Sequence, residues 1–135
     1  MPKVDIFYMH APDKDVPLEE TLAGINDAYQ AGLFSRFGLS NYPASEVQAA
    51  YDICKANGYV LPTVYQGNYS AVARKQETIL FPTLRKLNMS FYAYSPIAGG
   101  FLAKSKQYIL DKKGRFDPDT PIGMYHPMTP LISIY

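Results

Sequence analysis

The sequence predicts an α/β fold that is built around a parallel sheet. Four short apolar segments have the composition of strands and begin roughly 30 residues apart along the chain. One helical pattern separates each of these segments from the next, which gives a repeated strand–helix–strand unit. Such units connect parallel strands through right-handed crossovers. Each predicted strand also ends in polar residues, at the place where parallel α/β folds bind ligands.

The first strand is predicted over residues 4–9, where β-branched and aromatic residues predominate. Its nearly unbroken apolar character favours a strand that is covered on both faces. A helix is expected between Pro17 and Gly32, because proline suits the first helical turn and glycine suits the C-terminal end. Four residues at helical spacing give this helix one apolar face: Leu18, Leu22, Ile25 and Tyr29.

The second strand is expected over residues 33–39, and the polar pair Ser40–Asn41 separates it from a helix over residues 43–57. The single cysteine, Cys54, lies on the apolar face of this helix, where a small buried hydrophobic residue is the favoured interpretation. One cysteine cannot form a disulfide within the chain and suits a reducing compartment, so we expect a cytoplasmic protein.

The third strand is predicted over residues 61–65 and is followed by Gln66. A third helix is predicted over residues 76–87, and Pro82 should kink or divide it because proline lacks the N–H that a helix interior requires. The fourth strand is predicted over residues 91–94, where the sequence is again rich in aromatic residues.

Periodicity fades after the fourth strand. The cationic run over residues 104–113 is interpreted as a solvated loop, and the proline-rich residues 117–135 as an irregular tail, which leaves residues 1–116 as one domain. The formal net charge is +1 without a basic stripe, which argues against binding to nucleic acid or membrane lipid. No run of about 18 apolar residues predicts a membrane span.

Two architectures use repeated strand–helix units, namely an open doubly wound sheet and a (β/α)₈ barrel. The open sheet usually carries a glycine-rich turn after its first strand, whereas residues 10–13 here read His-Ala-Pro-Asp. A complete TIM-type barrel needs about 250 residues, of which these four units could supply about half. A half barrel leaves two open sheet edges, which favour a homo-oligomer.

The ends of all four predicted strands carry groups that can be polar: His10, Ser40–Asn41, Gln66 and Tyr94–Ser95. In a parallel barrel these groups converge on one rim. An imidazole can hydrogen-bond a carbonyl oxygen, amide and hydroxyl groups can orient a carboxamide, and a tyrosine ring can stack on a flat heterocycle. Gly99–Gly100 would let the backbone approach a phosphate, and Lys104 would add positive charge.

Each of these groups also has an ordinary structural interpretation. A single histidine after a strand is more often a hydrogen-bonded structural residue, and Ser-Asn before proline is a common helix start. The functional interpretation gains weight because all four strand ends carry such groups. Their spacing alone leaves a binding domain and an enzyme open as alternatives.

Four segments in order resemble the aldo-keto reductases: Val4–His10, Gly38–Asn41, Val64–Gln66 and Tyr94–Gly100. The segments Pro62–Gly67 and Glu77–Pro82 are similar to the aflatoxin-aldehyde reductase branch of that family. The resemblance implies a TIM-type barrel that reduces aldehydes and ketones, its small-molecule carbonyl substrates, with NADPH. The chain would then supply about the fourth to the seventh barrel strands, and no metal is implied.

The resemblance also implies roles for single residues. His10 matches the family's catalytic histidine, which orients the substrate carbonyl. Ser40, Asn41 and Gln66 match the residues that hold the nicotinamide carboxamide, and Tyr94 matches the ring that stacks on the nicotinamide. The remaining cofactor contacts, in the pyrophosphate loop and beyond it, are matched by Ser95, Pro96, Ile97, Gly99, Gly100, Lys104 and Arg115.

The family's acid–base groups are an Asp, a Tyr and a Lys from strands that precede the first one here, and none of the twelve tyrosines matches that acid. A positioned acid contributes about 10² to 10⁴ in rate. We therefore expect a truncated reductase with impaired or no activity alone. The alternative is a non-catalytic cofactor-binding remnant or an interaction module that self-associates through open sheet edges.

Overall fold

The computed structural model describes residues 3–112, 114 and 117 and contains a four-stranded parallel sheet in the order β1-β2-β3-β4. The strands are Val4–Met9 (β1), Phe34–Ser40 (β2), Pro62–Asn68 (β3) and Ser90–Tyr94 (β4). The helices between them are Leu18–Gln30 (α1), Ala44–Asn57 (α2) and Leu80–Lys86 (α3). The predicted α/β fold with parallel strands is confirmed.

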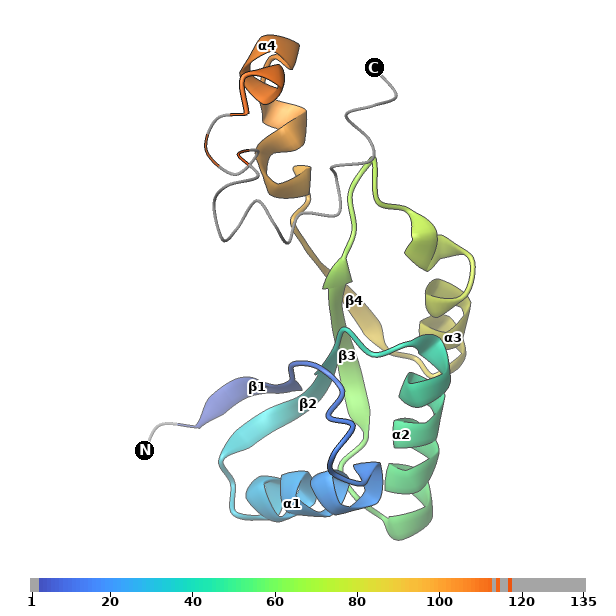
Figure 1. Cartoon of the computed structure of the whole chain (residues 1–135). Helices are drawn as coiled ribbons and strands as arrows, with labels where there is room; N and C mark the ends of the chain where they lie inside the picture. Colours follow the sequence, from blue (N-terminus) through green and yellow to red (C-terminus); the bar gives the residue numbers. More distant parts are fainter. Residues whose placement is uncertain (1–2, 113, 115–116, 118–135) are drawn as a thin grey trace.

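The three helices α1, α2 and α3 lie on one side of the sheet, and the hydrophobic core fills the space between them (Figure 1). Phe37 and Leu39 of β2 are completely buried in this core. Because successive strand residues point to opposite faces, Arg36 and Gly38 face the other side of the sheet. There the Arg36 guanidinium donates to the Tyr92 hydroxyl of β4 at 3.4 Å.

The first strand is less covered than its apolar sequence predicted. Val4 is 52% exposed and Phe7 is 40% exposed. Val4 and Phe7 point to opposite faces of β1, so neither face is completely covered. In the described part of the chain β1 also stands at one edge of the sheet, beside β2. The expected covering of both faces is therefore wrong for these residues.

The predicted ends of the first two helices are confirmed. Pro17 directly precedes α1, and Gly32 follows it with a positive φ of 75°. Gly58 ends α2 in the left-handed conformation, at φ 67°, where its N–H reaches back to the carbonyl of Lys55. Glycine suits this place because it has no Cβ to clash in the left-handed region.

The helix predicted over residues 76–87 is divided into two, but not by Pro82 itself. A short 3₁₀ helix, Lys75–Glu77 (η1), precedes α3, and the break falls at residues 78–79. Pro82 lies within the first turn of α3, where its missing N–H costs no intrahelical hydrogen bond. The division therefore comes before the proline and not at it.

Two short helices follow β4 and lie beyond its C-terminal end (Figure 1). They are the 3₁₀ helix Ala98–Ala103 (η2) and the α-helix Lys106–Leu110 (α4). The loop predicted for the cationic run is wrong over α4, because Ser105 caps this helix by accepting from the Tyr108 N–H at 3.2 Å. Arg115 and most of the predicted tail lie outside the described residues.

Candidate functional site

The carboxyl ends of the parallel strands bring the predicted site residues to one edge of the sheet. His10 directly follows β1, Ser40 ends β2 and Tyr94 ends β4. Gln66 lies inside β3, which runs three residues further than the predicted end at residue 65. In the strand register Gln66 stands between Ser40 on β2 and Tyr92 on β4.

Asn41 connects three of these strand ends through its side chain. Its Nδ2 donates to the carbonyl oxygen of His10 at 2.9 Å and to Ser40 Oγ at 3.1 Å. Its Oδ1 accepts from the Tyr94 hydroxyl at 2.8 Å. Asn41 itself has a φ of 62°, a left-handed conformation that asparagine tolerates better than most residues. We call these four residues the Asn41 cluster: His10, Ser40, Asn41 and Tyr94.

These contacts limit what Asn41 can offer to a ligand. Both N–H bonds of its amide are already used within the protein, whereas the amide oxygen retains a second lone pair. Asn41 can therefore act only as an acceptor. The side chain of Ser40 is almost completely buried, while that of Gln66 is half-buried and carries two amide N–H donors. A carboxamide ligand needs both an acceptor and a donor, and Asn41 with Gln66 supplies both.

Two tyrosines to which the sequence analysis assigned no function, Tyr42 and Tyr65, stabilise the loops at the carboxyl ends of the strands. The Tyr42 hydroxyl donates to the carbonyl of Ala11 at 3.2 Å, and the Tyr65 hydroxyl donates to the carbonyl of Tyr42 at 2.7 Å. Burial raises the pKa of Tyr65 to about 12, so its hydroxyl remains a donor at neutral pH. An aromatic residue directly after the Ser40–Asn41 pair is the only sequence signal for this support.

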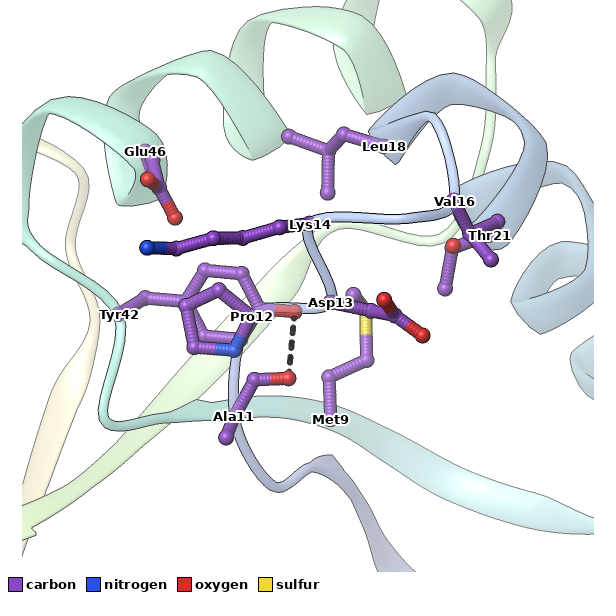
Figure 2. A pocket seen from close by; sticks show the side chains of 10 residues that line it. All are labelled: Met9, Ala11, Pro12, Asp13, Lys14, Val16, Leu18, Thr21, Tyr42 and Glu46. Atoms are coloured by element: carbon purple, nitrogen blue, oxygen red, sulfur yellow. Dashed lines mark hydrogen bonds between the residues drawn. The ribbon is translucent and has the colours of Figure 1, made fainter.

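A pocket of about 450 Å³ lies beside the segment that follows His10 (Figure 2). The β1–α1 connection and the first turns of α1 and α2 form its walls, which include Asp13, Lys14 and Glu46. The hydrogen bond from Tyr42 to Ala11 crosses one side of it. The His10 side chain is exposed and is not among the residues that line this pocket. The Asn41 cluster is therefore distinct from this pocket.

The Gly99–Gly100 segment folds into tight turns. Four residues here have positive φ values: Ser95 (53°), Ala98 (51°), Gly99 (67°) and Gly100 (103°). The Ala98 N–H donates to Ser95 at 2.8 Å, and the Gly100 N–H donates to Ile97 at 3.0 Å. A phosphate could approach at Gly100, since the position that a Cβ would occupy has no atom within 4 Å apart from those of the adjoining backbone. The Gly100 N–H, however, is already used.

Lys104 does not join the Asn41 cluster in this structure. Its ammonium lies 4.6 Å from the centre of the Tyr108 ring, a cation–π contact within the segment after β4. Pro96 and Ile97 are exposed on the loop that precedes η2. The structure therefore brings His10, Ser40, Asn41 and Tyr94 together and leaves the predicted phosphate contacts in a separate segment.

The described residues contain no group of three or more His, Cys, Asp or Glu side chains that could hold a metal ion. Among them there is also no helix that is both long and apolar enough to cross a membrane.

Comparison with known proteins gives a match to the model of the aldo/keto reductase family over residues 2–121. The human protein aflatoxin B1 aldehyde reductase member 4 is 50% identical over 124 residues, which are 92% of this chain and 36% of that protein. Human aflatoxin B1 aldehyde reductase member 2 is 48% identical over 92% of this chain and 33% of that protein. The chain thus spans about a third of the length of these curated relatives.

Two solved structures share the fold. A putative 2,5-diketo-D-gluconic acid reductase B matches 77% of this chain and 35% of its own, with 26% identity and a TM-score of 0.67. A thermostable aldo-keto reductase in complex with the inhibitor epalrestat matches 82% of this chain and 39% of its own, with 25% identity and a TM-score of 0.67. The four strand–helix units correspond to part of a TIM-type barrel, as the sequence predicted.

Proposed function

The chain belongs to the aldo/keto reductase family, and we propose that it binds NADPH at the Asn41 cluster for the reduction of aldehydes and ketones to alcohols. The names of the relatives, which are aldehyde reductases, support an aldehyde as the substrate class. NADPH, and not NADH, is proposed from the family resemblance, and a cytoplasmic location from the single thiol. The observation that carries the proposal is the Asn41 side chain, which joins three strand ends.

The residues present fit the nicotinamide end of the cofactor. We propose that Asn41 Oδ1 accepts from the carboxamide N–H and that the Gln66 amide donates to the carboxamide oxygen. The Tyr94 hydroxyl is held by Asn41 at 2.8 Å, which limits the positions open to the ring that would stack on the nicotinamide. When bound, NADPH supplies the hydride.

His10 is the residue that we propose for the substrate. An imidazole N–H can donate to the carbonyl oxygen of an aldehyde and so hold the carbonyl in one orientation. The exposed His10 side chain is reachable by a substrate, while its backbone carbonyl is fixed by Asn41. The same asparagine would therefore set the cofactor and the histidine relative to each other.

We propose that the 135-residue chain alone binds NADPH but reduces aldehydes weakly, because no tyrosine in it matches the proton donor of the family. Turnover equal to that of an intact reductase would contradict the weak activity. It would not bear on NADPH binding, which is measured separately.

The experiment is a fluorescence titration of the full chain with NADPH. Gln66→Leu should weaken binding about tenfold, since the proposed amide donor to the carboxamide oxygen is lost. Gln48→Leu is the matched control, because Gln48 lies on α2 and contacts Asp52 and Lys86 instead of the strand ends. Equal weakening by both substitutions, or binding that neither changes, would contradict the assigned site.

A second candidate function is self-association through the sheet edges. The observation in its favour is that the two edge strands of the described sheet, β1 and β4, carry exposed apolar residues such as Val4, Phe7 and Tyr92. Unpaired strand edges of this kind pair readily with another chain. Sedimentation of the purified chain tests this function: a dimer or larger species supports it, and a stable, well-folded monomer excludes it.

A further inference from the structure

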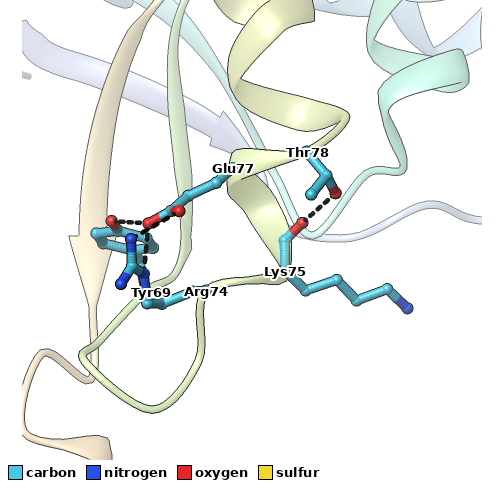
Figure 3. Close-up of polar contacts among 5 residues, drawn as sticks. All are labelled: Tyr69, Arg74, Lys75, Glu77 and Thr78. Carbon is cyan, nitrogen blue, oxygen red and sulfur yellow. Dashed lines mark hydrogen bonds and ion pairs between the residues drawn. The ribbon is translucent and has the colours of Figure 1, made fainter.

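Three side chains near the start of α3 form a hydrogen-bonded group that the proposed function does not use (Figure 3). Glu77 Oε1 accepts from the Tyr69 hydroxyl at 2.6 Å and from Arg74 Nε at 2.7 Å. Glu77 Oε2 accepts from Arg74 Nη2 at 2.9 Å. Arg74 therefore binds both carboxylate oxygens of Glu77 in a bidentate ion pair, which is the strongest geometry for such a pair. We call Tyr69, Arg74 and Glu77 the Glu77 clamp.

The carboxylate of Glu77 is the centre of this clamp, because both other side chains bind to it. Hydrogen bonds from Arg74 and then from Tyr69 lower the pKa of Glu77, so it is ionised at neutral pH. Its hydrogen bond is also the main cause that raises the pKa of Tyr69, which keeps the tyrosine hydroxyl protonated as a donor. Neither Tyr69 nor Arg74 can replace the carboxylate as the shared acceptor.

The ring of Tyr69 is fixed by packing as well. Its centre lies 5.1 Å from that of Phe81 on α3 and 6.0 Å from that of Phe91 on β4. The connection after Tyr69 closes on itself, because Ser70 and Ala73 form a short antiparallel bridge. The clamp thus joins the end of β3, the start of α3 and the side of β4.

The clamp is linked to the Asn41 cluster through the backbone. The Tyr69 N–H donates to the carbonyl of Tyr94 at 3.3 Å, which extends the ladder between β3 and β4 by one bond. The hydroxyl of the same Tyr94 donates to Asn41 Oδ1 at 2.8 Å. From the Glu77 carboxylate to the Asn41 amide there are thus three hydrogen bonds in series, and Tyr69 and Tyr94 lie between.

We propose that Glu77 is a positioning residue for the candidate nicotinamide site: it holds Tyr69, and through the Tyr69–Tyr94 hydrogen bond it keeps Tyr94 against Asn41. This inference rests on the proposed function, because its consequence is a cofactor affinity. Glu77 acts through other residues, since its carboxylate is engaged by Arg74 and Tyr69 away from the Asn41 cluster.

The test uses the full chain with Glu77→Leu, Glu77→Gln and Tyr69→Phe, and with Thr78→Val as the matched control. Thr78 lies next to Glu77, and its hydroxyl donates to the Lys75 carbonyl at 3.0 Å, outside the clamp. Two quantities are measured well below the unfolding temperature: the NADPH dissociation constant, and the ¹⁵N resonances of the Asn41 side-chain amide. A loss of overall stability alone would leave both unchanged in the folded fraction.

We expect Glu77→Leu and Tyr69→Phe to shift the Asn41 resonances and to weaken NADPH binding about threefold to tenfold. Glu77→Gln should lie between these variants and the wild type, because it keeps an acceptor for Tyr69 and loses the charge that holds Arg74. Thr78→Val should match the wild type in both measurements.

The inference is overturned if the Asn41 resonances stay in place in folded Glu77→Leu and Tyr69→Phe, or if Thr78→Val shifts them equally. A wild-type chain that does not bind NADPH would overturn the proposed function instead. The Asn41 resonances would still decide whether the clamp controls the cluster, so the two failures can be told apart.

Discussion

The Asn41 amide donates from Nδ2 to the carbonyl oxygen of His10 at 2.9 Å, although 31 residues separate them in the sequence. This bond joins the end of β2 to the residue after β1, and the same side chain reaches Tyr94 after two further strands. One residue in a left-handed conformation thus sets the relative positions of three strand ends.

The first prediction separates the hydrogen bonds of Asn41 from its backbone conformation. Asn41→Gly removes the side chain but accepts the φ of 62°, whereas Asn41→Ala removes the same hydrogen bonds and adds the strain of a left-handed alanine. Asn41→Ala should be less stable than Asn41→Gly by about 1 kcal/mol. Urea unfolding of both variants measures the difference, and equal midpoints would exclude a contribution from strain.

The second prediction concerns the close approach of β1 to β2. A Cβ at Gly38 would lie 2.5 Å from Cε1 of Tyr8, so Gly38→Ala must displace that ring and should destabilise the chain by about 1–3 kcal/mol. Gly24→Ala is the control, since α1 leaves open space at Gly24. This variant should gain about 0.5–1 kcal/mol. In the background of Tyr8→Ala, the cost of Gly38→Ala should largely vanish, and an unchanged cost would argue against this contact.

The third prediction concerns the buried thiol. Cys54 is 1% exposed, and burial raises its pKa to about 11, so a thiol reagent at pH 8 should react far more slowly with the folded than with the unfolded chain. The raised pKa also predicts that the free energy of unfolding falls as the pH rises. Well below pH 9 the thiol is protonated in both states, and between about pH 9 and pH 11 it ionises mainly in the unfolded state.

The stability of the wild type should therefore fall relative to Cys54→Ala as the pH rises from 8 to 10.5. Urea unfolding of both chains at each pH measures this difference, which also cancels the titration of the tyrosines that the two chains share. A difference that stays constant over this range would contradict the raised pKa.

The fourth prediction tests the support beneath Asn41. Tyr65→Phe removes the 2.7 Å bond to the carbonyl of Tyr42 and leaves that buried acceptor without this donor. We expect a loss of about 1–2 kcal/mol in the free energy of unfolding. Tyr51→Phe should change it by less, because the Tyr51 hydroxyl makes no hydrogen bond among the described residues. Equal losses of stability in the two variants would contradict the supporting role of the Tyr65 hydroxyl.

Much of the fold could be predicted from local patterns. β-Branched and aromatic runs predicted the four strands, and Gly32 predicted the end of α1, where it has the positive φ that glycine tolerates. The short helix α4 could not be predicted from periodicity, since five residues span little more than one turn. The exposure of Phe7 also could not be read from β1, because a strand's place in the sheet depends on its neighbours.

The candidate site was predicted in part. Polar residues after parallel strands indicated which side chains share an edge, and His10, Ser40, Asn41 and Tyr94 do lie together there. The spacing did not indicate that Asn41 uses both of its amide N–H bonds within the protein, nor that the Gly100 N–H is used by Ile97. These contacts join loops through their three-dimensional geometry, which a linear pattern does not contain.

The measurement that tests the central claim most directly follows the side-chain amide resonances of the ¹⁵N-labelled chain as NADPH is added. We expect the amides of Asn41 and Gln66 to shift with saturation, while that of Gln48 on α2 does not. A fragment of the cofactor without the nicotinamide should leave all three in place. If NADPH shifts other resonances but neither Asn41 nor Gln66, or if the fragment shifts these two equally, the Asn41 cluster does not hold the carboxamide.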